Sequence, residues 1–503
     1  MRLINRLFLA LLSCALSVGV FAQTQDSTVV AAKDSVAPKK TKVFLEHANT
    51  LSFDKERNAE AQVLNGDVCF RHDSSYMYCD SAYFFEQTNS LEAFSNVRME
   101  NGQVTLFTDS LNYERIPDIG YYFDGGLIVD SLNQLSSFYG QYSPSTKLAI
   151  FNDSVRLENE QFTLYSDTLH YNTDSKIATI LGPSIIVSDS GTIYSSRGWY
   201  DTVNNTSLLL DRSQVVSGDR ILTGDSIAYN RELGFGEAFG NMSLQDTAQH
   251  VMLEGQYGFY NEKTEYAFAT DSARFLEFSQ GDTLFLHGDT LKMTTVDSLY
   301  REVKAYYGVR FYRTDMQGVC DSMQFNTRDS ILYMYTDPIV WNEQYQIYGD
   351  TILIFMNDSS IDFAHVKQFA FAIQQIDSTA FNQLKGNDLK AYFEGQVVNQ
   401  IDVSGNAESI FFPLEKDGSM VGMNETKSGF LTIWLKDNKL DKLKIWPTPT
   451  GTMTPIPDLK PDQKYLKDFY WFDYIRPKDK DDIYQVVKRQ AQDAPKRSNK
   501  FVH

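Results

Sequence analysis

One short phrase returns along this chain about every thirty residues, and it restricts the chain to a repeat architecture. The phrase is an Asp, a small hydroxyl residue, an apolar residue, any residue and an aromatic, as in Asp109-Ser110-Leu111-Asn112-Tyr113. Self-similarity at a fixed period is typical of stacked units that cannot bury their apolar sides alone. The first residues of the full and degenerate copies stand at 80, 109, 140, 167, 197, 225, 255, 289, 321 and 350. With weaker copies near Asn49 and Asp388, the array has about a dozen units.

Each unit contains two short runs rich in Val, Ile, Leu, Tyr and Phe. Turn-forming residues separate them, as at 172–175, 204–205 and 261–263. Alternating apolar runs bounded by Asn, Asp, Gly and Ser are typical of β-strands. We therefore predict an all-β fold, an elongated β-jelly-roll or solenoid stack of about a dozen two-strand repeats. At one layer per unit and roughly 4.8 Å per layer, the stack would be on the order of 50 Å long.

The second and fourth positions after the first residue of the phrase share one face of their strand, because side chains alternate. They are apolar in nearly every unit, so stacking would merge them into one apolar interior. That interior is either a dry core or a trough that holds lipid. The candidate lining residues are Phe84, Leu111, Tyr113, Leu169, Tyr171, Ile227, Tyr229, Tyr257 and Phe259.

The repeated Asp and Ser or Thr are open to several interpretations. Such groups serve as catalytic carboxylates, as calcium ligands, or within an O-glycosylation signal of the form Asp-Ser/Thr-apolar. The simplest alternative is a turn at a corner of the unit, where these side chains hydrogen-bond the local backbone. The near-identical recurrence favours the turn, since a catalytic site needs one unit that differs.

The N-terminus is expected to direct export. Arg2 and Arg6 precede the apolar run Leu7 to Phe21, which predicts a signal peptide over 1–22, cleaved after Ala22. Cys14 lies in a lipobox-like context, so lipidation of Cys14 is an alternative. Residues 23–42 are rich in Thr, Ser, Ala and Lys and predict a flexible leader. We expect a periplasmic location, with association to the outer membrane left open.

Charge and cysteine content exclude some classes of protein. The net charge of −19 argues against a nucleic-acid binder, which carries a basic surface. After cleavage at Ala22, Cys69, Cys79 and Cys320 remain, too few for a disulfide scaffold. Cys69 and Cys79 flank a predicted hairpin turn at 73–75, so a disulfide between them and two single buried thiols are both open.

The array is assigned to residues 43–395, after which the pattern changes. Residues 396–475 predict a small β-rich C-terminal cap, with the runs 430–435 and 440–446 as a hairpin. The aromatic cluster 469–474 would pack back on the cap or dock a partner. Residues 476–503 form a charged tail, with a short helix expected over 481–492.

The recurring Gly-Asn/Asp-Val and Asp-Ser/Thr-Leu-x-Tyr phrases resemble the LptA/OstA-like family. The matching stretches are 66–68, 93–97, 108–113, 166–171 and 238–242. This resemblance to periplasmic lipopolysaccharide-transport proteins implies the fold they share with LptC and the N-terminal domain of LptD. It further implies a stack of antiparallel strands whose interior holds acyl chains of lipopolysaccharide or a related lipid, without a cofactor. The implied partners are other β-jelly-roll export proteins that join by edge-strand pairing, or further copies of the chain joined end to end.

Enzymatic function is not expected. The seven His residues show no spaced pair, and the sequence lacks nucleophile-elbow, zinc-protease, phosphate-loop and dinucleotide motifs. Two alternatives to lipid transfer or bridging remain. One is a carbohydrate-active β-solenoid enzyme that uses clustered carboxylates. The other is an outer-membrane β-barrel or a scaffold protein of envelope assembly.

Overall fold

The computed structural model describes residues 42–53, 60–278, 281–296, 300–357, 361–394, 397–415, 418–436, 439–487 and 489. The chain divides into two compact units, Met1–Lys42 and Val43–His503. All described residues except Lys42 belong to the second unit. Residues 1–41 are outside the described residues. The signal peptide over 1–22, with Cys14, and the leader over 23–42 therefore stay predictions.

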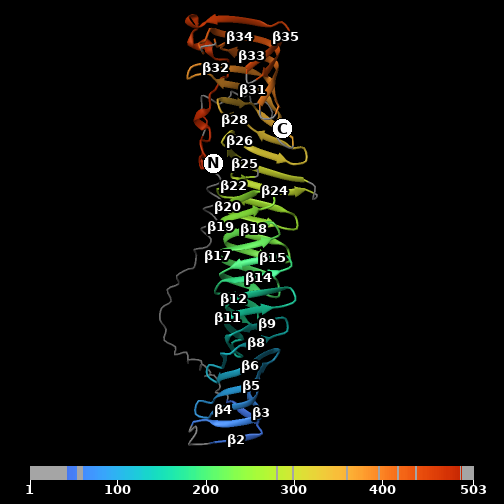
Figure 1. The fold of residues 1–503 in the computed structure, drawn as a ribbon, viewed down its shortest axis with the longest axis vertical. Helices are drawn as coiled ribbons and strands as arrows, with labels where there is room; N and C mark the ends of the chain where they lie inside the picture. The colour runs from blue at the N-terminus through green and yellow to red at the C-terminus, as the bar shows by residue number, and fades with distance from the viewer. Residues whose placement is uncertain are drawn as a thin grey trace, which may run out of the picture. The chain divides into compact units, whose positions relative to one another are not determined.

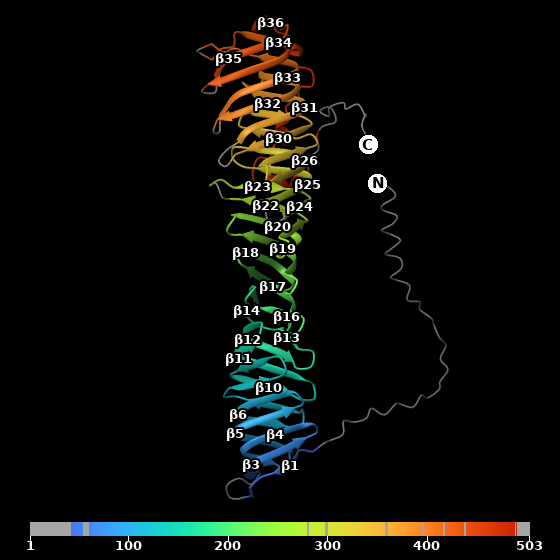
Figure 2. The ribbon, with the colours of Figure 1, turned by 90° about the vertical axis from the view of Figure 1, so that its right-hand side faces the viewer.

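The described part of the second unit is an elongated stack of 36 strands in one sheet (Figures 1 and 2). Neighbouring strands pair antiparallel throughout, as β3 and β4 do. Helical structure in the described residues is limited to four short 3-10 turns, η1 (Ile456–Asp458), η2 (Pro461–Lys464), η3 (Asp473–Ile475) and η4 (Asp482–Tyr484). The predicted all-β, elongated repeat stack is confirmed.

Each layer of the stack bends at a corner into two arms. In β5 (Ser90–Asn101), Ser95 and Asn96 both have positive φ, and the pairing with β6 shifts between Phe94 and Val97. This bulge bends the strand, because two residues on one strand lie opposite fewer on its partner. We call the arm that contains Leu91 to Phe94 arm A and the arm that contains Val97 to Asn101 arm B.

Some strands cross both arms, and others occupy one arm only. The strands that cross both arms are β3 (Gln62–His72), β4 (Ser75–Phe85), β5 (Ser90–Asn101), β6 (Val104–Glu114), β11 (Leu148–Glu158), β12 (Phe162–Asn172), β17 (Thr206–Ser217), β18 (Arg220–Asn230), β19 (Phe235–Asp246), β20 (Val251–Asn261), β25 (Tyr300–Tyr312), β26 (Gln317–Asn326), β31 (Ile361–Gln375), β32 (Phe381–Glu394), β33 (Val397–Phe411) and β34 (Gly422–Lys436).

In the remaining layers two short strands replace one long strand, one in each arm. They form the couples β1 (Phe44–His47) and β2 (Thr50–Ser52), β7 (Ile119–Tyr122) and β8 (Gly126–Val129), β9 (Gln134–Ser137) and β10 (Tyr139–Ser143), β13 (Ile177–Ile180) and β14 (Ser184–Ser188), β15 (Gly191–Ser195) and β16 (Arg197–Asp201), β21 (Tyr266–Thr270) and β22 (Arg274–Glu277), β23 (Leu284–His287) and β24 (Thr290–Val296), β27 (Ile331–Tyr335) and β28 (Ile339–Asn342), β29 (Tyr345–Tyr348) and β30 (Thr351–Met356), and β35 (Lys439–Trp446) and β36 (Thr450–Pro455).

The stack is longer than the sequence indicated. Sixteen long strands and ten couples make 26 layers, which at roughly 4.8 Å per layer span about 120 Å. The expected length of about 50 Å was wrong because each unit adds two layers. The unit 62–85, for example, is a hairpin of β3 and β4, so the chain crosses the stack once in each direction.

The core lies between the two arms. One cluster of buried apolar side chains runs from Val43 to Leu431 and includes Leu111, Leu169 and Ile227. The predicted turns at 172–175, 204–205 and 261–263 lie at the ends of arm A, next to β12, β16 and β20. The side chains two residues after Asp109, Asp167 and Asp225, which are Leu111, Leu169 and Ile227, therefore face inward as expected from the sequence.

The chain after β36 forms a strap. Residues 456–487, which we call the C-terminal strap, run back along the outer face of arm B (Figure 1). Phe472 and Ile475 pack on Ile339 and Trp341. The aromatic cluster 469–474 thus packs on β28 of the array as well as on the predicted cap. Strand β33 pairs with β32 across the expected boundary at 396, and the division into array, cap and tail stays a prediction.

One local expectation was wrong, and one alternative that the sequence left open is decided. The helix expected over 481–492 is absent from its described residues, where only η4 forms and Gln485 is extended. Cys69 and Cys79 are free thiols. Cys69 pairs with Tyr78 and Val68 with Cys79, which places the two sulfur atoms on opposite faces of the sheet.

Among the described residues we find no helix with the length and apolar character needed to cross a membrane.

Candidate functional site

The interior between the arms is the candidate site, and most of the predicted lining residues point into it. Leu111, Leu169 and Ile227 are fully buried. Tyr113, Tyr171 and Tyr229 are also buried. Phe84 is half-buried and packs against the same core.

Tyr257 and Phe259 were assigned to the interior, and this facing was wrong. In β20 the buried side is that of Gly258 and Tyr260, whereas Tyr257 and Phe259 are half-buried on the outer face. The corner of this layer is at Gln256, one residue after the position taken as the start of the unit. A shift of one residue exchanges the two faces of a strand. On the outer face, the ring of Tyr257 contacts the rings of Phe239 and Phe268.

A row of tyrosines follows the interior of arm A along the first half of the stack. The ends of the two arms meet on the side opposite the corners. We call this side the mouth. The row nearest the mouth alternates Tyr with Gly, Ala or Ser on successive paired strands. Its members are Tyr113, Gly120, Tyr142, Ala149, Tyr171, Ala178, Tyr200, Ser207, Tyr229, Gly236, Tyr260 and Ala267.

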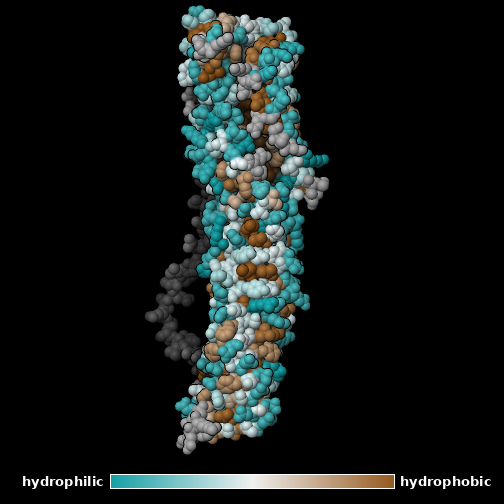
Figure 3. Space-filling model, viewed as in Figure 1, coloured by the Kyte–Doolittle hydropathy of each residue, from teal (hydrophilic) through white to brown (hydrophobic). Residues whose placement is uncertain are grey.

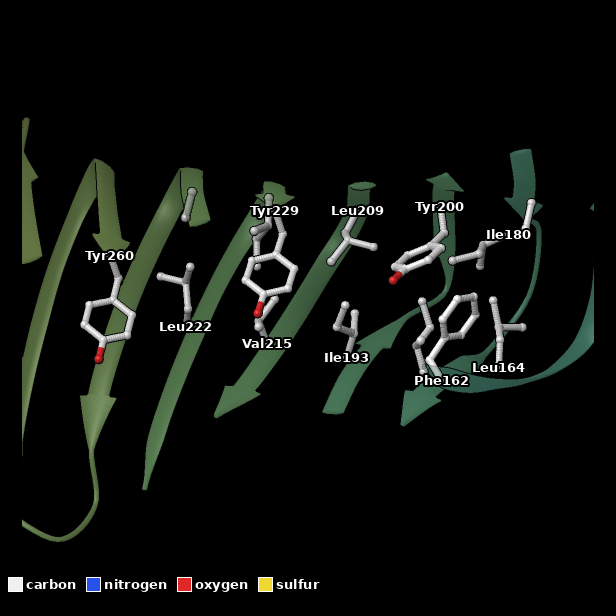
Figure 4. Packing of buried hydrophobic residues seen from close by; sticks show 14 of the residues in the cluster. Phe162, Leu164, Ile180, Ile193, Tyr200, Leu209, Val215, Leu222, Tyr229 and Tyr260 are labelled. Carbon is white, nitrogen blue, oxygen red and sulfur yellow. The ribbon is translucent and has the colours of Figure 1, made fainter. Parts of the chain in front are cut away.

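We call this row, with its continuation described below, the mouth row. In its first half the rings fill the space that the small residues leave on the neighbouring strands. Figure 4 shows the rings of Tyr200, Tyr229 and Tyr260 beside the aliphatic side chains of Leu222 and Ile193. A tyrosine suits this position because its ring is apolar and its hydroxyl can reach polar groups at the mouth.

The Tyr171 hydroxyl joins the two arms. It donates to Oδ2 of Asp130 at 2.6 Å and accepts from Nδ2 of Asn133 at 2.8 Å, both at the end of arm B. Lys176 of arm A lies 2.9 Å from the same Asp130 oxygen. Burial alone raises the pKa of Asp130, but hydrogen bonds from Tyr171, the Leu132 amide and Lys176 outweigh it and lower that pKa. Burial, followed by the bond to Asp130, raises the pKa of Tyr171.

Similar polar contacts close the mouth in the neighbouring layers. In each, a side chain from the end of arm B meets one from the end of arm A. The pairs are His72 with Tyr113 (2.5 Å), Asn101 with Lys147 (2.5 Å), Gln161 with Asn205 (2.8 Å) and Arg231 (2.8 Å), Arg220 with Tyr260 and with Glu265 (3.2 Å), and Asp246 with Arg301 (3.4 Å). We call these contacts, with the Tyr171 cluster, the polar seam.

The mouth row changes character after Ala267. Its pairing continues without a break through Met293, Val303, Phe325, Leu332, Ile354, Ala364, Ala391, Ile401, Ile433 and Leu443. None of these side chains has a hydroxyl or amide group. Met293, Val303, Phe325, Leu332, Ile401 and Ile433 are half-buried, whereas Tyr142, Tyr171 and Tyr200 are fully buried.

The repeated Asp residues lie at the corners, away from the mouth. The exposed carboxylate of Asp80 accepts from Nδ2 of Asn96 at 2.6 Å, and Asp225 accepts from Asn241 at 2.8 Å. The hydroxyl of Thr108 donates to the carbonyl of Gly125 at 2.7 Å. These bonds tie one corner to the next across paired strands and are not the local backbone bonds of the expected turn. Only the Thr108 hydroxyl, among these groups, also bonds the local backbone, at the Ser110 carbonyl (3.1 Å). No cluster of three or more His, Cys, Asp or Glu suited to a metal was found among the described residues.

A hollow of about 780 Å³ lies outside the arms. Tyr165, Ile185 and Tyr194 of arm B line it, together with Arg156 and Arg212. It opens to solvent and contains none of the predicted lining residues.

Three members of the tyrosine row were not among the predicted lining residues: Tyr142, Tyr200 and Tyr260. A signal for two of them was present, since Tyr113, Tyr142, Tyr171, Tyr200 and Tyr229 follow one another at steps of 29 residues. The degenerate units conceal it, because Tyr142 and Tyr200 lack an Asp at the usual place before them.

Comparison with known families gives a match to the first half of the array. Residues 40–104, 95–167 and 154–225 each match the family model described as OstA-like protein. Each match covers about two of the thirty-residue units. The resemblance to the LptA/OstA-like family is confirmed over these residues, and that family is in general one of periplasmic lipopolysaccharide transport. A search of curated proteins found no match.

Proposed function

Since residues 40–225 are three successive OstA-like repeats, we propose that this chain binds lipopolysaccharide or a related lipid and carries or bridges it through the periplasm. The acyl chains would lie in the apolar interior between the arms. The observation that carries the proposal is the mouth row, which continues through paired strands from Tyr113 to Leu443. Binding and transfer by such an interior need no catalytic group.

The energetics of acyl chains favour an interior of this kind. Transfer of one methylene group from water to an apolar environment is worth about 0.8 kcal/mol, so a chain of about a dozen methylenes gains roughly 10 kcal/mol. The lining side chains need only be apolar and accessible. The affinity would thus come from burial, and the polar part of the lipid would stay at the mouth.

The two ends of the stack support a bridging role. Strands β1 and β2 pair with β3 on one side, and β35 and β36 pair with β34 on one side. Their outer edges carry backbone groups that a partner strand would pair with. Phe44 and Leu51 are about half exposed at the first of these edges. We propose that similar β-jelly-roll proteins, or further copies of the chain, join there.

Photocrosslinking in cells tests the lipid proposal. Photoreactive amino acids are placed one at a time at Leu111, Leu169 and Phe325, and at least one of these interior positions is expected to crosslink to lipopolysaccharide. Tyr257 provides a matched control, since it lies on the outer face of the same sheet. Crosslinks from Tyr257 that equal those from the interior positions, or no crosslinks from any interior position, would contradict the proposal.

A further inference from the structure

We propose that acyl chains enter only the part of the interior formed by β24 to β35, and that the part formed by β6 to β21 is a sealed stalk. This inference rests on the proposed function and locates its site. It follows from the change in the mouth row between Ala267 and Met293.

The first half of the interior has no room for a lipid. Tyr142, Tyr171 and Tyr200 have no exposed surface. The void lined by Leu222, Tyr229, Leu244 and Tyr260 measures about 10 Å³, which accommodates no more than one water molecule. An acyl chain would have to displace the rings, and the hydroxyls of Tyr171 and Tyr200 would lose their bonds to Asp130 and Asn205.

The polar seam makes that displacement costly. Opening the mouth at Tyr171 would separate Asp130 from both Tyr171 and Lys176. Each broken bond leaves a buried polar group without a partner, which is unfavourable, and more so when the group is charged. Several such contacts follow one another from His72 to Asp246, so a lipid would have to break them in series.

The second half of the interior offers accessible apolar surface instead. Phe325, Leu332 and Ile401 of the mouth row are half-buried and have no polar atom to satisfy. Figure 3 shows apolar side chains set back between polar ones level with the strands β24 to β28 of Figure 1.

On β31 to β34 the opposite wall is made mainly of small residues, with Leu384 as the large exception. The inward positions of arm B on β31 to β34 include Ala372, Gly386, Ala407, Ser409 and Thr426. Small side chains on one wall leave width for a ligand that large side chains would fill. On β23 to β29 the same wall carries large side chains, which are Leu286, Phe311, Val340 and Ile347. In the first half the corresponding wall carries Leu157, Leu164 and Ile186, all buried.

The length of the second half suits acyl chains. The mouth row from Met293 to Leu443 crosses nine strand spacings, or about 40 Å at roughly 4.8 Å each. One leaflet of a membrane is about 15 Å of hydrocarbon, so chains of that size fit along this part of the interior.

The test uses the full-length purified chain and a photoactivatable myristic acid. Labelled positions are located by mass spectrometry of peptides. We expect label on peptides that contain Val303, Phe325, Leu332 and Ile401, and little on those that contain Tyr142, Tyr171 and Tyr200.

A pair of variants sharpens the test. Ile433→Glu places a charge in the open half, where the half-buried position lets the carboxylate reach water and the fold is retained. It is expected to weaken binding of the probe about tenfold or more. Tyr171→Phe in the sealed half is the control and should leave binding within about twofold. Thermal unfolding of both variants checks that each is folded.

The outcomes separate the two proposals. Label concentrated on residues 104–260, or binding lost in Tyr171→Phe and retained in Ile433→Glu, would overturn the assignment to β24 to β35 alone. A folded chain that takes up no probe at all would overturn the lipid proposal and this inference with it.

Discussion

Tyr171 illustrates how a single residue serves two environments in this fold. Its ring lies between Ala149 and Ala178 on the neighbouring strands, and its hydroxyl reaches the Asp130 carboxylate at the mouth. Phenylalanine would fill the same space but leave Asp130 and Asn133 with one partner fewer. The alternation of Tyr with Ala, Gly or Ser is therefore a packing requirement, since two rings on adjacent strands would compete for one space.

Leu169 tests the facing of the interior. Leu169→Asp should lower the free energy of unfolding by about 3–5 kcal/mol, because it buries an unpaired charge at a site with no exposed surface. Leu111→Asp should behave in the same way. Chemical denaturation followed by circular dichroism measures the change.

Ile185→Asp is the matched control for Leu169→Asp. Ile185 is in β14, which pairs with β12, but its side chain is 40% exposed on the outer face. A charge there should cost about 1 kcal/mol or less. Equal losses at Leu169 and Ile185 would contradict the facing.

The tyrosine row predicts sensitivity to alkaline pH. Burial raises the pKa of Tyr200 to about 12, and it raises the pKa of Tyr171 and Tyr229 as well. An unfolded tyrosine titrates near 10, so the raised folded values favour the protonated folded state. Their contribution to stability is complete below about pH 10 and is lost as the pH rises toward the folded pKa. The unfolding midpoint should therefore fall steeply above about pH 10.

Tyrosinate absorbance provides the second measurement for this prediction. The buried tyrosines should ionise together with unfolding, not before it, because their ionisation requires exposure. In Tyr171→Phe the alkaline loss of stability should be smaller, since one raised pKa is removed. An unfolding midpoint that does not change between pH 8 and 11 would rule out the proposed coupling.

At the scale of elements, the C-terminal strap is held by side-chain amides that bind its backbone. Oε1 of Gln346 accepts from the Phe472 amide at 2.8 Å, and Nε2 donates to the Tyr470 carbonyl at 2.8 Å. Gln383 binds the Leu466 amide and the Lys464 carbonyl in the same way, both at 2.8 Å. The side chains of these two buried glutamines thus make the hydrogen bonds to the strap backbone that a neighbouring strand would otherwise make.

Phe472→Ala should release part of the strap. Phe472 is fully buried with Trp341, and removal of a buried phenylalanine ring costs about 3–5 kcal/mol. Hydrogen exchange should accelerate in residues 464–476, while β3 to β20 keep their protection. Val486→Ala is the control, because Val486 is 89% exposed. Loss of protection throughout the array would show that the strap is not a separate local element.

At the scale of the whole molecule, the antiparallel stack predicts which deletions are tolerated. Removal of residues 206–234 takes out β17 and β18 and joins Asn205 to Phe235. Strand β19 would then occupy the place of β17 on β15 and β16 in the same direction. Because each layer contacts mainly its neighbours, the shortened chain should fold. Its maximum dimension in small-angle X-ray scattering should fall by about 10 Å, two strand spacings.

Deletion of a single layer is the matched control. Removal of residues 206–219 takes out β17 alone, so β18 would have to pair in the direction opposite to that of β17. This deletion should disrupt the array. A folded product from the single-layer deletion, with none from the two-layer deletion, would contradict the antiparallel topology.

The sequence alone determined the period, the strand character, the turns at the ends of arm A and the inward positions of each unit with a regular Asp. Those features are local, since strand alternation and turn preference act over a few residues. The tertiary structure decided what depends on pairing between distant residues. The strand register placed Tyr257 on the outer face and Tyr260 in the interior. It also aligned Met293 with Ala267, where the tyrosine row ends. The pairing of the two strands of each unit as a hairpin gave each unit two layers. Contacts more than a hundred residues apart, such as Gln346 with Phe472, also have no local signal.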